Sequence, residues 1–293
     1  MNARVLFPTK RASRLLAGAV PLLLISAGFT GPAWAITGGE VDEQNTYSNV
    51  GALVWLPPDG SGPVVAGSGT LIHPRVFLTA GHIAIFGEEN PWAIPLTFVS
   101  FGTDALEPSS WHEVEAAITH PEYKYNPTGP CGQFANDVGV IILKKPVNTR
   151  KVPLANLPYA GFLDDLAAGL LRMSDQGIEP FIVVGYGTTL DWPPPEIVDV
   201  DGLRRFAQSG YLALTQAWLF TLTNPATGNG GTGYSDSGGP TFWVAPDGTL
   251  VLVAVISRRD PYGMATNIAW RVDIPEMLDF IDWVINAVLP SLP

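Results

Sequence analysis

The sequence has almost no cysteine: Cys131 is the only one among 293 residues. One thiol cannot form an intrachain disulfide, so the fold must be stabilised by core packing instead of cross-links. No catalytic motif surrounds Cys131, and we therefore expect a small buried or loop residue there and not a thiol nucleophile. No spacing of acidic residues indicates a metal site either, so we expect no metal.

Charge and long apolar runs are also sparse. Charged residues make up 15% of the chain, whereas glycine and proline number 31 and 27. This composition favours many short strands joined by turns over long helices. The apolar run at residues 15–27 is too short for a comfortable membrane span.

Residues 1–35 have the pattern of a secretory signal peptide. Four basic residues precede the apolar run, and residues 33–35, Ala-Trp-Ala, match a signal-peptidase site. The alternative is an uncleaved membrane anchor. Cleavage after Ala35 would leave 12 basic against 27 acidic residues, a net charge of about −15. We therefore expect a secreted protein, extracellular or periplasmic, with no stable membrane insertion after cleavage. An acidic surface repels nucleic acid, so no nucleic-acid partner is expected.

Apolar, β-branched runs recur along the chain, bounded by turn residues such as Pro-Pro-Asp-Gly at 57–60. This pattern is typical of an all-β sandwich or barrel. Residues 192–201 contain three consecutive prolines and are expected to form an exposed loop. The expected strands are residues 50–56, 64–72, 76–79, 138–143, 181–184, 211–214 and 250–256.

The last segment of the chain has a helical pattern instead. Apolar residues at positions 278, 281, 285 and 288 recur at the spacing of one helix face. Asp273 is placed to cap this helix, with Glu276 three residues later completing a capping box. Acidic residues within the segment exclude a membrane span.

Three separated segments supply a histidine, an aspartate and a serine in that order. Residues 78–82 read Leu-Thr-Ala-Gly-His, residues 136–140 read Asn-Asp-Val-Gly-Val, and residues 233–240 read Gly-Tyr-Ser-Asp-Ser-Gly-Gly-Pro. The order His, Asp, Ser is one of the few chain orders that deliver a Ser-His-Asp triad.

These motifs resemble those of the chymotrypsin-like (trypsin-fold) serine peptidases, and the likeness runs from residue 36 to the end. The resemblance implies an all-β fold of two six-stranded antiparallel β-barrels, with the active site in the cleft between them and a C-terminal α-helix. The barrel with the histidine and aspartate would span residues 36–157, and the barrel with the serine and the specificity pocket residues 158–274. Residues 275–293 would form the helix and tail. The absence of a disulfide beside the histidine fits a bacterial-type member.

The resemblance implies that Ser237 is the nucleophile, His82 the general base and then the general acid, and Asp137 the carboxylate that orients His82. A free serine hydroxyl is a weak nucleophile and needs such a base. The two glycines after Ser237 let the backbone turn sharply and approach a substrate. The implied reaction is hydrolysis of a protein or peptide through an acyl-enzyme, without a cofactor.

In this family the aspartate before the nucleophile, here Asp236, pairs with the free amino group of the mature N-terminus. Residues 36–39 read Ile-Thr-Gly-Gly, similar to the usual Ile-Val-Gly-Gly, and directly follow Ala35. We predict that signal peptidase itself produces Ile36 as the activating N-terminus.

The backbone N–H groups of Ser235 and Ser237 are expected to form the oxyanion hole. The family normally has glycine at the position of Ser235, because the peptide there takes a conformation that glycine adopts cheaply. A serine at this position predicts backbone strain or a flipped peptide, and with either of these a reduced activity.

Substrate-binding residues are expected on two segments. Counting back from the nucleophile places the base of the specificity pocket at Gly231 and Thr232, where no acidic residue supports a preference for Arg or Lys. Ser257 ends a strand expected to pair with the substrate backbone. Arg258 and Arg259 follow where the family usually has Trp-Gly. Facing the cleft, they would attract an acidic side chain or obstruct the pocket; on a loop, they would be solvated.

Two other functions are open to this sequence. An α/β-hydrolase esterase would need Gly-x-Ser-x-Gly and the order Ser, Asp, His, whereas residues 235–239 read Ser-Asp-Ser-Gly-Gly. A protease-like binding protein, impaired in catalysis by Ser235 or by Arg258 and Arg259, is the non-enzymatic alternative. In each case we expect a monomer.

Overall fold

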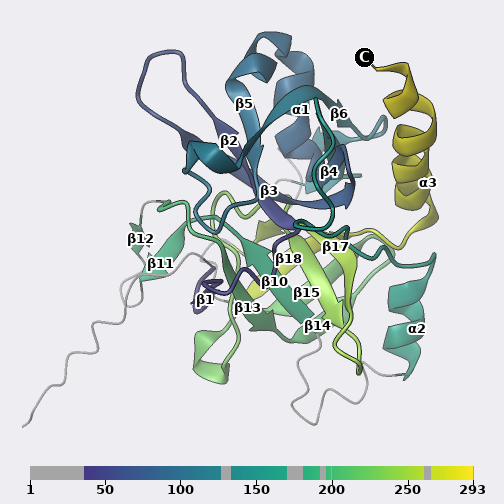
Figure 1. Ribbon diagram of the computed structural model, residues 1–293. Helices are drawn as coiled ribbons and strands as arrows, with labels where there is room; N and C mark the ends of the chain where they lie inside the picture. Colours follow the sequence, from purple (N-terminus) through teal and green to yellow (C-terminus); the bar gives the residue numbers. More distant parts are fainter. Residues whose placement is uncertain are drawn as a thin grey trace, which may run out of the picture. The chain divides into compact units, whose positions relative to one another are not determined.

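Six antiparallel strands of the first half of the chain close into a barrel (Figure 1). The computed structural model describes residues 36–126, 133–169, 181–191, 196–198, 200–260 and 265–292, so the predicted signal peptide and Cys131 lie outside it. The barrel order is β2–β3–β4–β9–β6–β5, with β5 returning to β2. Its strands are β2 (Val50–Trp55), β3 (Val64–His73), β4 (Val76–Thr79), β5 (Thr97–Ser100), β6 (Trp111–Thr119) and β9 (Gly139–Leu143).

The second half of the chain forms an open sheet of eight antiparallel strands, in the order β1–β13–β10–β16–β17–β18–β15–β14. The fold is therefore mostly β, with one closed six-stranded barrel and one half-barrel sheet, and the described residues of the second half do not close into a second barrel. β1, from the start of the described chain, joins this second sheet beside β13. The strands are β1 (Glu40–Val41), β10 (Phe181–Gly185), β13 (Arg205–Ser209), β14 (Tyr211–Leu214), β15 (Trp218–Leu222), β16 (Pro240–Val244), β17 (Leu250–Arg259) and β18 (Thr266–Arg271).

All seven expected strands are confirmed within a few residues. Most are apolar runs with β-branched residues that the core buries, whereas β14 is apolar but largely exposed. The expected loop at residues 192–201 is wrong in part. Glu196–Val198 forms a short strand, β12, that pairs with β11 (Thr189–Asp191). Proline cannot donate to a strand ladder, but the Glu-Ile-Val that follows the prolines can. A second hairpin pairs β7 (Lys124–Asn126) with β8 (Gln133–Ala135).

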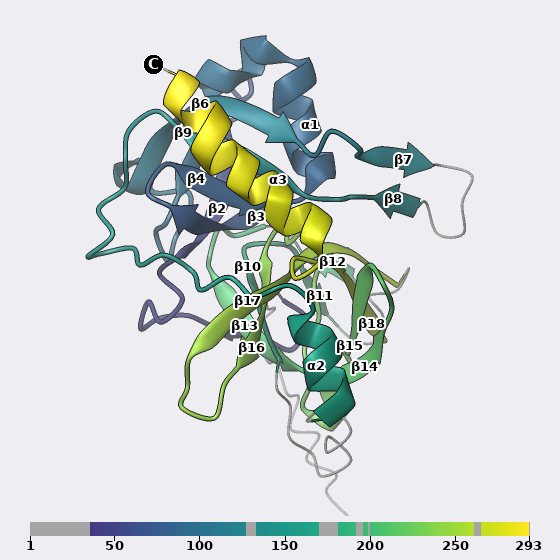
Figure 2. The same ribbon diagram turned by 90° about the vertical axis from the view of Figure 1, so that its right-hand side faces the viewer.

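The C-terminal helix is confirmed as α3 (Pro275–Trp283), which continues as further helical turns to Ser291. Figure 2 shows α3 running across the closed barrel, where the Phe280 ring lies 5.0 Å from that of His120. The expected capping box is wrong. Asp273 instead accepts hydrogen bonds from Arg271 Nε and Nη2, both at 2.8 Å, and from the backbone N–H of Leu163 in α2 (Phe162–Gly169). Among the described residues, no helix is both long and apolar enough to cross a membrane.

A buried arginine connects the two sheets. Arg204 is fully buried and donates hydrogen bonds to Asp42 Oδ2 at 2.9 Å, to the carbonyl of Val50 at 2.9 Å and to the Tyr186 hydroxyl oxygen at 3.0 Å. The Tyr186 hydroxyl in turn donates to the carbonyl of Gly102 at 2.7 Å. A buried charge is tolerated only with such a full set of partners. These bonds hold the segment after β1, the barrel and the second sheet together.

Candidate active site

His82 and Asp137 meet at one end of the closed barrel. His82 lies in the first turn of α1 (Gly81–Glu89), directly after β4, and Asp137 lies just before β9. Asp137 Oδ1 accepts the backbone N–H of His82 at 2.8 Å, and His82 Nδ1 lies 2.9 Å from Asp137 Oδ2. The carboxylate is fully buried. It therefore fixes both the ring and the backbone of His82, and favours the tautomer that carries its proton on Nδ1.

Two further side chains complete this arrangement. The Ser257 hydroxyl donates to Asp137 Oδ2 at 2.5 Å, although the sequence assigned Ser257 only to substrate binding. The ring of Phe134, on β8, is stacked on the His82 ring at 4.8 Å between centroids. Phe134 was not among the predicted site residues. With these contacts on one face, the side chain of His82 is 18% exposed.

Ser237 lies in a tight turn just before β16. Gly238, the next residue, has a φ of +88° and donates its N–H to the carbonyl of Ile256 at 2.7 Å. The carbonyl of Ser237 accepts the backbone N–H of Ser68, on β3, at 2.8 Å. No hydrogen bond between the Ser237 hydroxyl and His82 is found in the described part of the chain. Such bonds are often long without a bound substrate.

One cavity of about 310 Å³ brings the nucleophile and base candidates together. Gly231, a predicted pocket residue, does not line it and instead pairs with Thr37 through its backbone. The lining comprises His82, Thr232, Gly233, Tyr234, Ser237, Ile256, Ser257, Arg258, Arg259 and Asp260. Of the five predicted substrate-binding residues, all but Gly231 therefore lie in the cavity wall.

The backbone at Ser235 takes the left-handed conformation that glycine favours, with a φ of +68°. The carbonyl of Tyr234 accepts the N–H of Thr188 at 2.6 Å, and the carbonyl of Ser235 accepts the Ser68 hydroxyl at 3.0 Å. In a trans peptide the N–H points opposite to the preceding C=O, so the Ser235 N–H is directed away from Thr188. Among the described residues, neither the Ser235 nor the Ser237 N–H has a protein acceptor; Ser237 lines the cavity, whereas Ser235 is not part of its lining.

Asp236 is fully buried and forms no ion pair among the described residues. Its two carboxylate oxygens accept the backbone N–H groups of Gly187 at 2.7 Å and Gly233 at 2.6 Å. Burial raises the pKa of Asp236 to about 7, and the two N–H groups lower it only in part. The carboxylate packs so closely on the backbone that a Cβ at Gly185 would overlap it. A nearby cation would stabilise the charged form of this group.

Ile36, the predicted mature N-terminus, is also fully buried. Its side chain packs with Val183, Ala207 and Ile256. In this chain, in which residue 35 precedes it, Ile36 has a φ of +53°, an unfavourable conformation for a β-branched residue. No hydrogen bond joins Ile36 to Asp236 in the described structure.

Arg258 and Arg259 end strand β17 at the cavity. The guanidinium carbon of Arg258 lies 4.9 Å from the centre of the Trp218 ring, and that of Arg259 lies 4.9 Å from the centre of the Tyr234 ring. Both side chains are half-buried. The interpretation as two solvated loop residues is therefore wrong, because the strand continues through both positions and aims them at aromatic rings.

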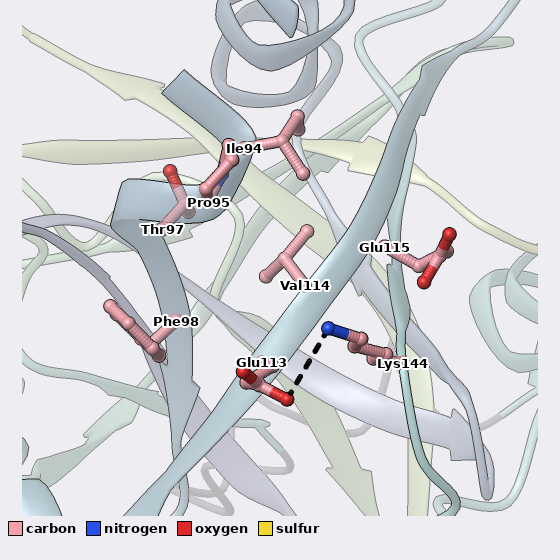
Figure 3. Close-up of a pocket in the computed structure, with 8 residues that line it drawn as sticks. All are labelled: Ile94, Pro95, Thr97, Phe98, Glu113, Val114, Glu115 and Lys144. Atoms are coloured by element: carbon pink, nitrogen blue, oxygen red, sulfur yellow. Dashed lines mark ion pairs between the residues drawn. The ribbon is translucent and has the colours of Figure 1, made fainter. Parts of the chain in front are cut away.

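Two other cavities lie outside this pocket. Figure 3 shows one of about 260 Å³ on the closed barrel, where Lys144 Nζ lies 3.7 Å from a Glu113 carboxylate oxygen. It contains no triad candidate. The other, of about 250 Å³, is mostly apolar, and its lining includes His82, Trp55 and Phe86.

No family model matches this chain, and no curated protein matches its sequence. The function has to be argued from the site itself.

Proposed function

We propose that this chain is a secreted serine endopeptidase that hydrolyses peptide bonds through an acyl-enzyme. One observation supports the proposal most: a buried carboxylate, Asp137, holds both the ring and the backbone of His82 in the wall of the cavity that Ser237 also lines. That combination of base, orienting carboxylate and candidate nucleophile is what acyl transfer requires.

The proposed reaction has two halves. Ser237 Oγ attacks the peptide carbonyl carbon while its proton passes to His82 Nε2, and the N–H groups of Ser235 and Ser237 bind the oxyanion. The C–N bond then breaks, and His82 gives the proton to the leaving amine. Water attacks the ester in the second half, its proton passes to His82, and Ser237 Oγ leaves with that proton. Asp137 stays ionised and stabilises the imidazolium in both halves.

We further propose that the half-barrel sheet corresponds to the second barrel of the trypsin fold, and that signal peptidase cuts after Ala35. The new amino group of Ile36 would then pair with Asp236, whose carboxylate oxygens accept only backbone N–H groups among the described residues. Reading the N-terminus of the secreted protein by mass spectrometry tests this step. A start at any residue other than Ile36 would overturn it.

The activity is tested by labelling the secreted protein with a fluorophosphonate, beside its Ser237→Ala and Ser235→Gly variants. Labelling requires a working nucleophile and oxyanion hole. We expect label on Ser237, none on the Ser237→Ala variant, and equal or faster labelling with glycine at position 235. Label on another serine would contradict the proposed nucleophile.

The positive φ of Ser235 favours a second candidate, a protease-like binding protein with an impaired oxyanion hole. A folded protein that begins at Ile36 but takes no label would support this alternative. Restored labelling in the Ser235→Gly variant would then identify Ser235 as the cause.

A further inference from the structure

The wall of the active-site cavity contains two arginines, each with its guanidinium over an aromatic ring. The guanidinium of Arg258 is stacked over Trp218, on β15. The guanidinium of Arg259 is stacked over Tyr234, which is 59% exposed at the cavity and directly precedes Ser235. Arg259 therefore lies beside the backbone that carries one of the two proposed oxyanion donors.

Arg259 has an unused buried donor. Its Nη1 atom is buried and has no hydrogen-bond partner among the described residues, and no ion pair with an acidic side chain is found there. A buried charged donor without an acceptor lowers stability. The Arg259 side chain also lines the cavity, and an arginine fork matches a carboxylate in shape as well as in charge, so a carboxylate that enters the cavity would bind the guanidinium.

Two other polar side chains of the cavity are already engaged. The Thr232 hydroxyl donates to Asn267 Oδ1 at 2.8 Å, and Asn267 Nδ2 donates to Ser209 Oγ at 3.1 Å. Asp260 Oδ2 accepts two backbone N–H groups of its own turn, both at 3.0 Å. Of the charged side chains that line the cavity, Arg259 is the one that stacks on the residue before Ser235, a proposed oxyanion donor.

We infer that the cavity accepts an acidic side chain, so that the enzyme cleaves peptides after Glu or Asp, with Arg259 binding the side-chain carboxylate. This inference rests on the proposed endopeptidase function. The same cavity is lined by Ser237, so a residue whose side chain fills it presents its own carbonyl to the nucleophile. Because the site is partly desolvated, the arginine–carboxylate attraction is stronger than in water.

The first test uses fluorogenic peptides that are identical except for Glu, Gln, Asp, Asn, Lys or Leu before the cleaved amide. Glu and Gln differ in charge but hardly in shape. We expect kcat/KM for Glu to exceed that for Gln by about 10-fold or more, a factor that corresponds to about 1.4 kcal/mol. Equal rates, or a preference for Gln, Lys or Leu, would overturn the inference.

Variants of Arg259 test whether this side chain causes the preference for Glu over Gln. Arg259→Met keeps the length of the side chain but removes its charge, so we expect the Glu rate to fall about 10-fold while the Gln rate changes little. Arg259→Lys should retain part of the preference. Arg150→Met, at an exposed position remote from the cavity, is the matched control and should leave both rates unchanged. Faster cleavage of every peptide by Arg259→Met would show that Arg259 obstructs the cavity instead.

A binding experiment separates this inference from the proposed function. The Ser237→Ala protein is titrated with acetylated tetrapeptides that end in Glu-amide, Gln-amide or Gln with a free carboxylate. Tighter binding of Glu-amide that is lost in the Ser237→Ala, Arg259→Met double variant supports the site even if no peptide is cleaved. Tighter binding of the free-carboxylate peptide would assign the pocket to chain termini, and equal binding of all three would reject a carboxylate site. Thermal unfolding of each variant shows that it is folded.

Discussion

The Ser68 hydroxyl, on a strand of the closed barrel, donates a hydrogen bond to the carbonyl of Ser235 at 3.0 Å. The same hydroxyl oxygen accepts the backbone N–H of Tyr186 at 3.1 Å. Ser68 therefore holds the peptide group that follows Ser235, the residue with the positive φ. A side chain of the closed barrel thus positions the backbone just before Ser237, the proposed nucleophile, which lies in the second half of the chain.

We predict that Ser68→Ala slows fluorophosphonate labelling of Ser237 by about 10-fold, because the Ser235 peptide loses its restraint. The lost hydrogen bonds should also lower the free energy of unfolding by about 1 kcal/mol. Labelling kinetics and urea unfolding measure the two effects. Ser61→Ala, at an exposed turn, is the control, and an unchanged labelling rate in Ser68→Ala would show that Ser68 has only a structural role.

Asp137→Asn should lower kcat by about 10⁴-fold, because the amide favours the wrong tautomer of His82 and does not stabilise an imidazolium. The substitution keeps the shape of the side chain, so binding of substrate should change much less than kcat. Steady-state kinetics on the best peptide substrate provide the measurement. Asp247→Asn, in an exposed turn, should have no effect, and a loss of less than 10-fold in Asp137→Asn would argue against the triad.

The uncut chain, with residue 35 still attached, should lose stability as pH rises. Burial raises the pKa of Asp236 to about 7 in the folded state, whereas an unfolded aspartate titrates near about 4. Between these values the folded state holds a proton that the unfolded state has released. The stabilisation is therefore complete below about pH 4 and is lost as pH rises to about 7, by at most about 1.4 kcal/mol per pH unit.

Urea unfolding of the uncut chain and of its Asp236→Asn variant at pH 5 and pH 8 isolates this contribution from other titrating groups. The chain that begins at Ile36 should behave in the opposite way, since an ammonium partner lowers the pKa of Asp236 and its stabilisation is then lost on acidification. The same pH dependence in all three proteins would disprove the proposed pairing.

Arg204→Met should destabilise the fold by about 3–5 kcal/mol, because it leaves the Asp42 carboxylate buried without its cation. The matched control is Glu113→Gln. Its ion pair with Lys144 joins two side chains that are both more than half exposed, so its loss should cost less than about 1 kcal/mol. Chemical denaturation measures both variants, and similar losses would show that Arg204 is not a structural connection.

The local features of the fold could be predicted from the sequence. Strands such as β4 and β9 are continuous apolar runs, and His82 and Asp137 stand in motifs beside them. The open edge of the second sheet and the pairing of β1 with β13 could not be predicted, because they depend on contacts between distant parts of the chain.

The capping role expected of Asp273 failed for a related reason. Its spacing to Glu276 fits a capping box, but the buried guanidinium of Arg271 competes for the same carboxylate and makes two hydrogen bonds to it. Phe134 was missed because nothing in the sequence near it marks a site. Ser68 was missed although the glycines on either side of it indicate a close approach of the backbone.

Because of the hydrogen bond from Ser68 to Ser235, the proposed active site is complete only when the two halves of the chain are packed together. His82 and Asp137 belong to one half of the chain, Ser237 to the other, and the brace on the backbone between them crosses from the first half to the second. If the chain is secreted as proposed, a chain that is still emerging from the secretion machinery, with its halves not yet joined, has no complete site. If the proposed chemistry is correct, such a chain cannot cut its neighbours during export.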